Sequence, residues 1–107
     1  PEEGDLLVIG WGGTFGALAS AVKDLQGEGK SISLAQFNYI NPLPRNTGEV
    51  LSGFKKIMVC ELNLGQFASY LRSKHPGHDY LQYNKVQGLP FFISELKIMF
   101  NEALESI

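Results

Sequence analysis

The sequence contains a single cysteine, Cys60, among its 107 residues. One cysteine excludes an intramolecular disulfide and a metal cluster held by cysteines alone, and it favours a cytoplasmic protein. Charge is also sparse, because 9 lysines and arginines stand against 11 aspartates and glutamates, for a formal net charge of -2. We therefore expect no basic surface that binds nucleic acid.

Long apolar runs are missing as well. No stretch approaches the roughly 18 consecutive apolar residues of a membrane span, and no basic-then-apolar signal segment begins the chain. The sequence also lacks a nucleophile elbow, a P-loop, paired catalytic carboxylates and the acidic cluster of a phospho-receiver domain. These absences predict a fold without a complete active site of its own.

The apolar content and the length of the chain suit one compact domain. Apolar residues make up 44% of the chain, and at this length folding buries roughly 65% of the surface of the unfolded chain. The chain begins with Pro1 and enters an apolar run within a few residues. We therefore interpret residues 1–107 as a single domain cut from a longer polypeptide, with residues 1–4 as the remainder of a linker.

Strand and helix patterns alternate four times along the chain. Short apolar or β-rich runs predict strands at 5–10, 31–37, 55–62 and 80–86. Helical spacing predicts a helix after the first, third and fourth of these strands, and a short helical piece, or alternatively an irregular turn, is expected around 47–54. In the last helix we expect Pro90 in the first turn and one buried face formed by Phe92, Leu96, Met99, Phe100 and Ala103. This alternation predicts a doubly wound, three-layer α/β/α sandwich around a mostly parallel sheet.

A glycine-rich turn follows the first strand in the stretch LLVIGWGGTFGALASAV. Its spacing misses the dinucleotide fingerprint, because Phe15 stands where the last glycine belongs. The second strand ends at Phe37 without the acidic residue that holds a ribose. We favour a tight turn with close helix packing and Thr14 as the helix N-cap. A phosphate or cofactor bound by the glycines is the alternative.

A second polar group follows the third strand, in the stretch CELNLGQF. Glu61, Asn63 and Gln66 are expected at the carboxyl ends of the strands, where such folds bind ligands, and they could contact a ligand or a partner chain. The alternative is that Asn63 caps the next helix while Glu61 faces solvent. Trp11, at the end of the first strand, is expected in packing or in an interface.

Two other features have simpler explanations. Cys60 lies in an apolar strand without a neighbour that would activate it, so we expect an inert core thiol. His75 and His78 have a spacing that could bind a metal ion, but the Pro-Gly pair between them favours a surface turn.

Three segments together carry a family resemblance. DLLVIGWGGTFGA, FNYINPLP and VCELNLGQFASYLR, in this order and spacing, closely resemble the C-terminal part of the α subunit of 2-oxoacid:ferredoxin oxidoreductases, in particular the 2-oxoglutarate branch. The similarity runs from about Gly4 to Leu104. It implies a transketolase C-terminal-like (Rossmann-like) domain with the strand order 2-1-3-4. In that family an additional antiparallel edge strand commonly precedes the first strand of this chain.

The resemblance also implies a function for the parent complex. Such enzymes oxidatively decarboxylate a 2-oxoacid with coenzyme A and pass electrons to ferredoxin, with thiamine diphosphate, Mg and an iron–sulfur cluster as cofactors. Their binding motifs lie in other domains, so no cofactor or catalytic residue is expected here. The positions carried over as interface or structural candidates are Trp11, Gly12, Gly13, Thr14, Gly16, Asn41, Pro42, Pro44, Glu61, Asn63, Gly65 and Gln66.

Two main hypotheses follow. The first is a non-catalytic assembly domain of the oxidoreductase, which contacts the other domains of the α subunit and the β subunit. The second is an independent nucleotide- or flavin-binding module, suggested by the glycine turn. A partner-binding module in an unrelated complex is a weaker third hypothesis.

Overall fold

The computed structural model describes residues 4–11, 15–37, 47–61, 66–84 and 91–107. Strands and helices alternate through these ranges. In chain order they are β1 (Gly4–Trp11), α1 (Phe15–Gly27), β2 (Ile32–Phe37), α2 (Thr47–Ser52), β3 (Phe54–Glu61), α3 (Gln66–Lys74), β4 (Tyr80–Asn84) and α4 (Ile93–Glu105). The predicted alternation is confirmed, and the segment after Thr47 is a short helix.

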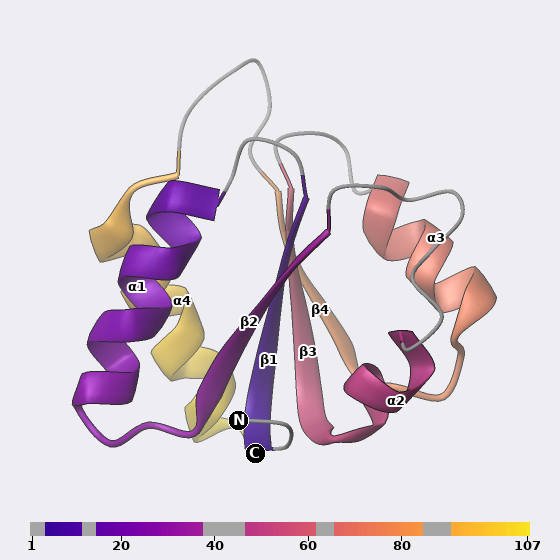
Figure 1. Ribbon diagram of the computed structural model, residues 1–107, viewed down its shortest axis with the longest axis horizontal. Coiled ribbons are helices and arrows are strands. Elements are labelled where there is room, and N and C mark those ends of the chain that lie inside the picture. Colours follow the sequence, from indigo (N-terminus) through magenta and orange to yellow (C-terminus); the bar gives the residue numbers. More distant parts are fainter. Residues whose placement is uncertain (1–3, 12–14, 38–46, 62–65, 85–90) are drawn as a thin grey trace.

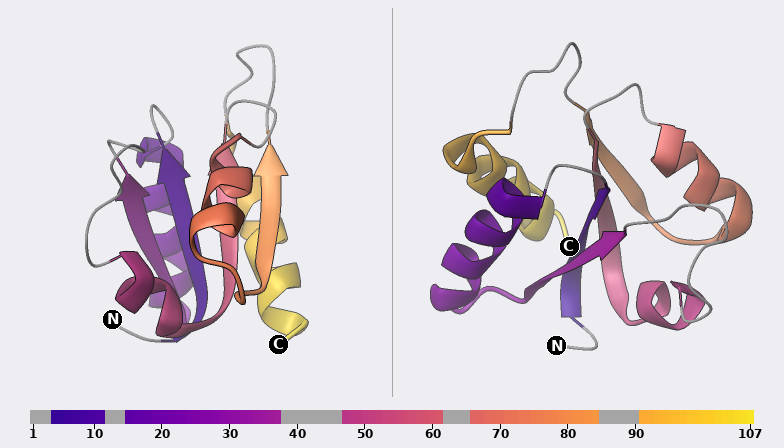
Figure 2. Two further views of the ribbon diagram at one scale, coloured as in Figure 1. Left: turned by 90° about the vertical axis from the view of Figure 1, so that its right-hand side faces the viewer. Right: turned by 45° about the horizontal axis from the view of Figure 1, so that its top comes forward.

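The described strands form one sheet in the order β2-β1-β3-β4, and every neighbouring pair is parallel. Leu6 of β1 pairs with Ile32 of β2, and Val8 of β1 pairs with Met58 of β3. Figure 2 shows the strands side by side with all their arrowheads at the same end. The strand order predicted from the resemblance is confirmed, and β1 lies inside the sheet.

The helices form the two outer layers. Helices α1 and α4 cover one face of the sheet, and α2 and α3 cover the other (Figure 1). Alternating side chains of each strand point to opposite faces, so each strand contributes to both layers. The three-layer sandwich expected from the sequence is confirmed.

Two apolar clusters, one on each face, hold the layers together. The first cluster joins Leu6, Val8, Met58 and Cys60 of the sheet to α1 and α4. The second joins the intervening positions, among them Ile57 and Val59, to α2 and α3. The largest fully buried side chains are Phe100, Leu6, Leu7, Ile9, Leu18, Leu25, Ile32, Leu51, Ile57, Leu71 and Leu96.

Helix α1 ends in a turn that contains a glycine with positive φ. Gly29 has a φ of 87°, in the left-handed region that glycine adopts without strain. The amide of Lys30 donates to the carbonyl of Leu25 at 3.0 Å, which closes a Schellman-type end. The glycine after the helix is therefore required by the turn that leads into β2.

The start of α4 differs from the prediction. The helix begins at Ile93 with Phe92 as its N-cap residue. Pro90, which was expected in the first turn, lies outside the described residues. Phe92 is 56% exposed, whereas Phe91 is 7% exposed and belongs to the first cluster. The expectation that Phe92 forms part of the buried helical face is wrong, because the chain is still extended there and turns the preceding phenylalanine inward.

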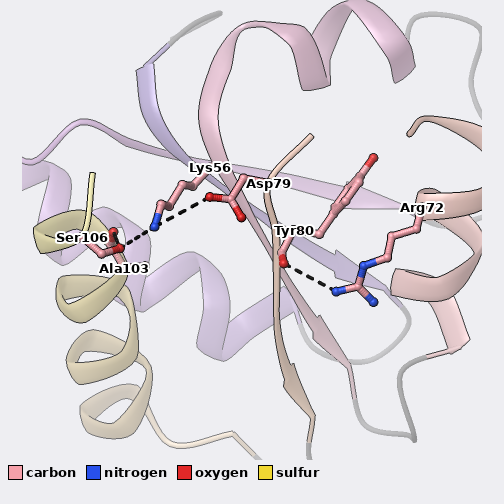
Figure 3. A network of polar contacts seen from close by, with 6 residues as sticks. All are labelled: Lys56, Arg72, Asp79, Tyr80, Ala103 and Ser106. Atoms are coloured by element: carbon pink, nitrogen blue, oxygen red, sulfur yellow. Dashed lines mark hydrogen bonds and ion pairs between the residues drawn. The ribbon is translucent and has the colours of Figure 1, made fainter. Parts of the chain in front are cut away.

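A polar network closes the end of the sheet where the strands begin (Figure 3). Lys56 Nζ donates to Ser106 Oγ at 2.6 Å and lies 3.8 Å from a carboxylate oxygen of Asp79. The amide of Ile57 donates to the carbonyl of Asp79 at 2.9 Å. These contacts join the end of α4 to β3 and to the turn before β4.

None of the described helices is long and apolar enough to cross a membrane.

Candidate functional site

All described strands end at one side of the sheet, which we call the carboxyl edge. β1 ends there at Trp11 and β3 at Glu61, one residue beyond the paired Gly10 and Cys60. Helix α3 begins nearby at Gln66. The fold thus brings the two predicted polar segments to the same edge. Other candidate positions lie outside the described residues: Gly12, Gly13, Thr14, Asn41, Pro42, Pro44, Asn63 and Gly65.

Glu61 is the best-defined polar side chain at this edge. It is fully buried, and its Oε2 accepts a hydrogen bond at 3.0 Å from the backbone N–H of Ala68, the third residue of α3. A carboxylate at this position satisfies an N–H that has no partner within the helix and faces the positive end of the helix dipole. The alternative in which Glu61 faces solvent is therefore wrong, and Glu61 caps α3.

The capping role of Glu61 has no short-range sequence signal. A capping box joins residues three positions apart, whereas Glu61 and Ala68 are seven apart and meet only because the strand end lies beside the start of α3. Whether Asn63 also caps this helix stays a prediction.

Gly16 occupies the second position of α1 and is exposed. A Cβ atom added there would meet nothing within 4 Å. Gly16 therefore makes no close packing contact with the described residues, and the packing role expected of the glycines of this turn stays a prediction.

Cys60 is the fully buried neighbour of Glu61. Burial, and secondarily the negative charge of Glu61, raises the pKa of the thiol from 9.0 to about 12. Its side chain lies in the first cluster, between the sheet and helices α1 and α4. The interpretation of Cys60 as a core thiol is confirmed, and this environment disfavours the reactive thiolate.

We expect Cys60 to resist labelling by maleimide in the folded chain. The rise of the pKa from 9.0 to about 12 reduces the thiolate fraction at pH 8 about a thousandfold, before burial slows access further. Mass spectrometry after timed labelling at pH 8 measures the rate, and the same chain in guanidinium chloride is the control. Equal rates in the folded and unfolded chains would contradict a buried thiol.

The same pKa difference makes the free energy of unfolding depend on pH. Between pH 9 and about 12 the unfolded chain releases the proton of Cys60 while the folded chain keeps it. The contribution of Cys60 to the free energy of unfolding is therefore constant below pH 9 and falls as the pH rises through this window.

A further polar contact near the carboxyl edge was not expected from the sequence. The hydroxyl of Tyr83 in β4 donates to Glu95 Oε2 in the first turn of α4 at 3.0 Å. The ring of Tyr83 also packs against Phe91, with the ring centres 5.4 Å apart. The two contacts fix the start of α4 against the end of β4.

The two histidines lie at the other end of β4. They flank a turn in which Gly77 has a φ of 92°, as the Pro-Gly pair predicts. The carbonyl of His75 accepts a 2.6 Å hydrogen bond from the hydroxyl of Tyr80, and the ring of His78 packs edge-on against Tyr80. The described residues include no group of three or more histidine, cysteine, aspartate or glutamate side chains placed to bind a metal ion.

Comparison with known proteins relates the chain to one subunit of a 2-oxoglutarate oxidoreductase. No protein-family model matches the chain. Over 102 residues, 95% of the chain, it is 37% identical to subunit KorA of a 2-oxoglutarate oxidoreductase from Mycobacterium tuberculosis. The chain is a homologue of part of that subunit. The resemblance to KorA-type subunits predicted from the sequence is therefore confirmed, and the chain covers 16% of the length of the KorA subunit.

Solved structures agree with the KorA relationship. A 2-oxoglutarate:ferredoxin oxidoreductase from Magnetococcus marinus, solved with 2-oxoglutarate, coenzyme A and succinyl-CoA bound, matches 95% of the chain with a TM-score of 0.87 and 26% identity. The match covers 18% of that chain. A split-gene transketolase, described as an inactive β4 tetramer, matches 96% of this chain and 40% of its own with a TM-score of 0.72 and 14% identity. This second match shows the fold alone and confirms its transketolase-like character.

Proposed function

We propose that the chain is the C-terminal domain of the α subunit of a 2-oxoglutarate:ferredoxin oxidoreductase and is a non-catalytic assembly domain there. The observation that carries this proposal is the 37% identity to a KorA subunit over 95% of the chain. The proposed complex decarboxylates 2-oxoglutarate oxidatively with coenzyme A, forms succinyl-CoA and reduces ferredoxin. This assignment is favoured over an independent nucleotide- or flavin-binding module.

The cofactors of the proposed complex are thiamine diphosphate, Mg and an iron–sulfur cluster, and the described residues do not fit them. The only cysteine of the sequence, Cys60, is buried among apolar side chains, and burial keeps its pKa near 12. The Oε2 of Glu61 already caps a helix. We therefore assign no reaction step to the described residues and propose that other domains of the complex bind the cofactors.

The geometry of the carboxyl edge supports an assembly role. Glu61 fixes the start of α3 from one face of the sheet, and Tyr83 with Glu95 fixes the start of α4 on the other. Both helix starts are thereby held by side chains that come from the sheet or contact it. In this proposal the edge is a rigid surface against other domains of the α subunit or against the β subunit, in a cytoplasmic enzyme whose substrates include coenzyme A and ferredoxin.

The test compares the chain by itself with the complete enzyme. The complete α subunit, purified with its β subunit, is expected to reduce ferredoxin when 2-oxoglutarate, coenzyme A and thiamine diphosphate are all present. The 107-residue chain under the same conditions is expected to give no turnover above a no-protein control. Absorbance of ferredoxin follows the reaction, and omission of each substrate in turn is the control.

Two outcomes would contradict the proposal. Turnover by the 107-residue chain alone would show that it carries catalytic groups. A complete complex that oxidises other 2-oxoacids but ignores 2-oxoglutarate would refute the assignment to the 2-oxoglutarate enzymes.

A further inference from the structure

Strand β4 lies at one edge of the described sheet, where β3 is its only neighbour among the described strands. The amide of Ile57 donates to the carbonyl of Asp79 at 2.9 Å, so this carbonyl faces β3. Backbone groups of alternate residues in a parallel strand point to the same side, which directs those of Tyr80 and Gln82 away from β3. We call this side the open edge of β4. Such an edge offers its backbone groups to any second strand that approaches.

The composition of β4 favours the addition of a second strand. Its sequence, YLQYN, contains no charged residue, no proline and no glycine. The side chains of Tyr80, Leu81 and Tyr83 lie at the margins of the two apolar clusters and are only partly buried. Edge strands with this composition pair readily with another copy of themselves unless a charge or a covering group prevents it.

Arg72 of α3 covers the open edge of β4. Its guanidinium points at the carbonyl of Tyr80 (Figure 3), with 3.5 Å between Nη2 and the carbonyl oxygen. The central carbon of the guanidinium lies 5.9 Å from the centre of the Tyr80 ring. In the amide orientation that satisfies both groups, the side-chain oxygen of Gln82 accepts from the same guanidinium. Arg72 therefore lies over both residues whose backbone groups point outward.

These contacts of Arg72 are poorly suited to holding the fold together. Arg72 is exposed, and an exposed contact of 3.5 Å contributes little to stability. Among the described residues, no carboxylate forms an ion pair with Arg72. Its positive charge is therefore not neutralised by the part of the chain that the structure describes, and it stands at an edge that has no charge of its own.

We propose that Arg72 prevents the open edge of β4 from pairing with the same edge of a second copy of this chain. Two copies paired through β4 would be related by a two-fold axis, which brings the Arg72 of each copy to the same junction. Each guanidinium would have to leave the Tyr80 carbonyl, and the two like charges would repel each other. The inference is independent of the proposed function, because it concerns contacts between copies of the chain and not the reaction.

The test measures self-association of single variants by sedimentation equilibrium over a series of concentrations of the 107-residue chain. Arg72→Ala removes the covering group. Lys74→Ala is the matched control, because Lys74 is exposed on the same helix and its Nζ lies over the ring of Tyr70, 5.8 Å from the ring centre. Both substitutions change the formal net charge from -2 to -3, so general repulsion between copies changes equally. Circular dichroism verifies that each variant keeps its fold.

Arg72→Ala is expected to associate at least about tenfold more tightly than the unmodified chain, with Lys74→Ala within about twofold of the unmodified chain. Arg72→Gln keeps a donor and removes the charge, so it is expected to associate as Arg72→Ala does. This second variant decides the case if Arg72→Ala does not keep its fold.

A double variant identifies the surface through which the copies associate. Arg72→Ala combined with Gln82→Lys restores a positive charge on β4 itself, which is expected to return association to the level of the unmodified chain. Three results would each overturn the proposal. They are Arg72 variants that associate no more than the unmodified chain, equal association of Lys74→Ala, and a double variant that associates as tightly as Arg72→Ala. The last result would show that the copies meet through a surface other than the open edge of β4.

Discussion

Replacing Glu61 by alanine is expected to lower the free energy of unfolding by about 3 kcal/mol. The substitution removes the partner of the Ala68 N–H, whose hydrogen bond to the carboxylate is 3.0 Å long and buried. Loss of a helix cap costs about 0.5–2 kcal/mol, and a buried donor without a partner adds about 1–3 kcal/mol. Urea unfolding followed by circular dichroism measures the change. A loss of this size is a large part of the roughly 5–15 kcal/mol that holds such a domain together.

The matched variant is Glu61→Gln. Glutamine keeps an acceptor oxygen of the same reach and removes only the negative charge, so we expect it to retain most of the stability, within about 1 kcal/mol of the unmodified chain. The difference between the two variants isolates the hydrogen bond from the charge. If alanine and glutamine proved equally harmless, Glu61 would not be the cap of α3.

Periodicity predicted the sheet and its layers because the interior of the fold repeats a simple pattern. In β3, Ile57 and Val59 face one cluster while Met58 and Cys60 face the other. A strand buried on both faces has an apolar residue at every position, which is visible in the sequence as a continuous run. The order of the strands came from the family resemblance, since the alternation itself is compatible with several orders.

The start of α4 was predicted wrongly because local pattern could not distinguish two adjacent phenylalanines. Phe92 has the helical spacing to Leu96 and Phe100, but the helix begins one residue later, and Phe91 enters the core. In the fold, Phe91 packs in the first cluster and against the ring of Tyr83. That contact joins residues whose proximity depends on the whole fold.

The candidate site was predictable in position and not in detail. Parallel strands end at a common edge, so the location of Trp11 and Glu61 followed from the fold class. The burial of Glu61 did not, because a glutamate at the end of a strand usually faces water. Its partner, seven residues further along the chain, becomes available only when α3 packs beside β3.

The largest expected loss of stability belongs to Phe100→Ala, at about 3–5 kcal/mol, the usual cost of truncating a buried phenylalanine. Phe100 is fully buried in the first cluster, between the sheet and α4. The milder Ile57→Val, in the second cluster, is expected to cost about 0.5–1.5 kcal/mol. Urea unfolding of both single variants and of the double variant measures all three changes on one scale.

The double variant tests the layered architecture itself. Phe100 and Ile57 belong to clusters on opposite faces of the sheet and share no partner within either cluster. Their effects should therefore add to within about 0.5 kcal/mol. A coupling well above that would mean that the two cores relax together through the sheet. Strict additivity, with Phe100→Ala far costlier than Ile57→Val, is what two separately packed layers on one rigid sheet require.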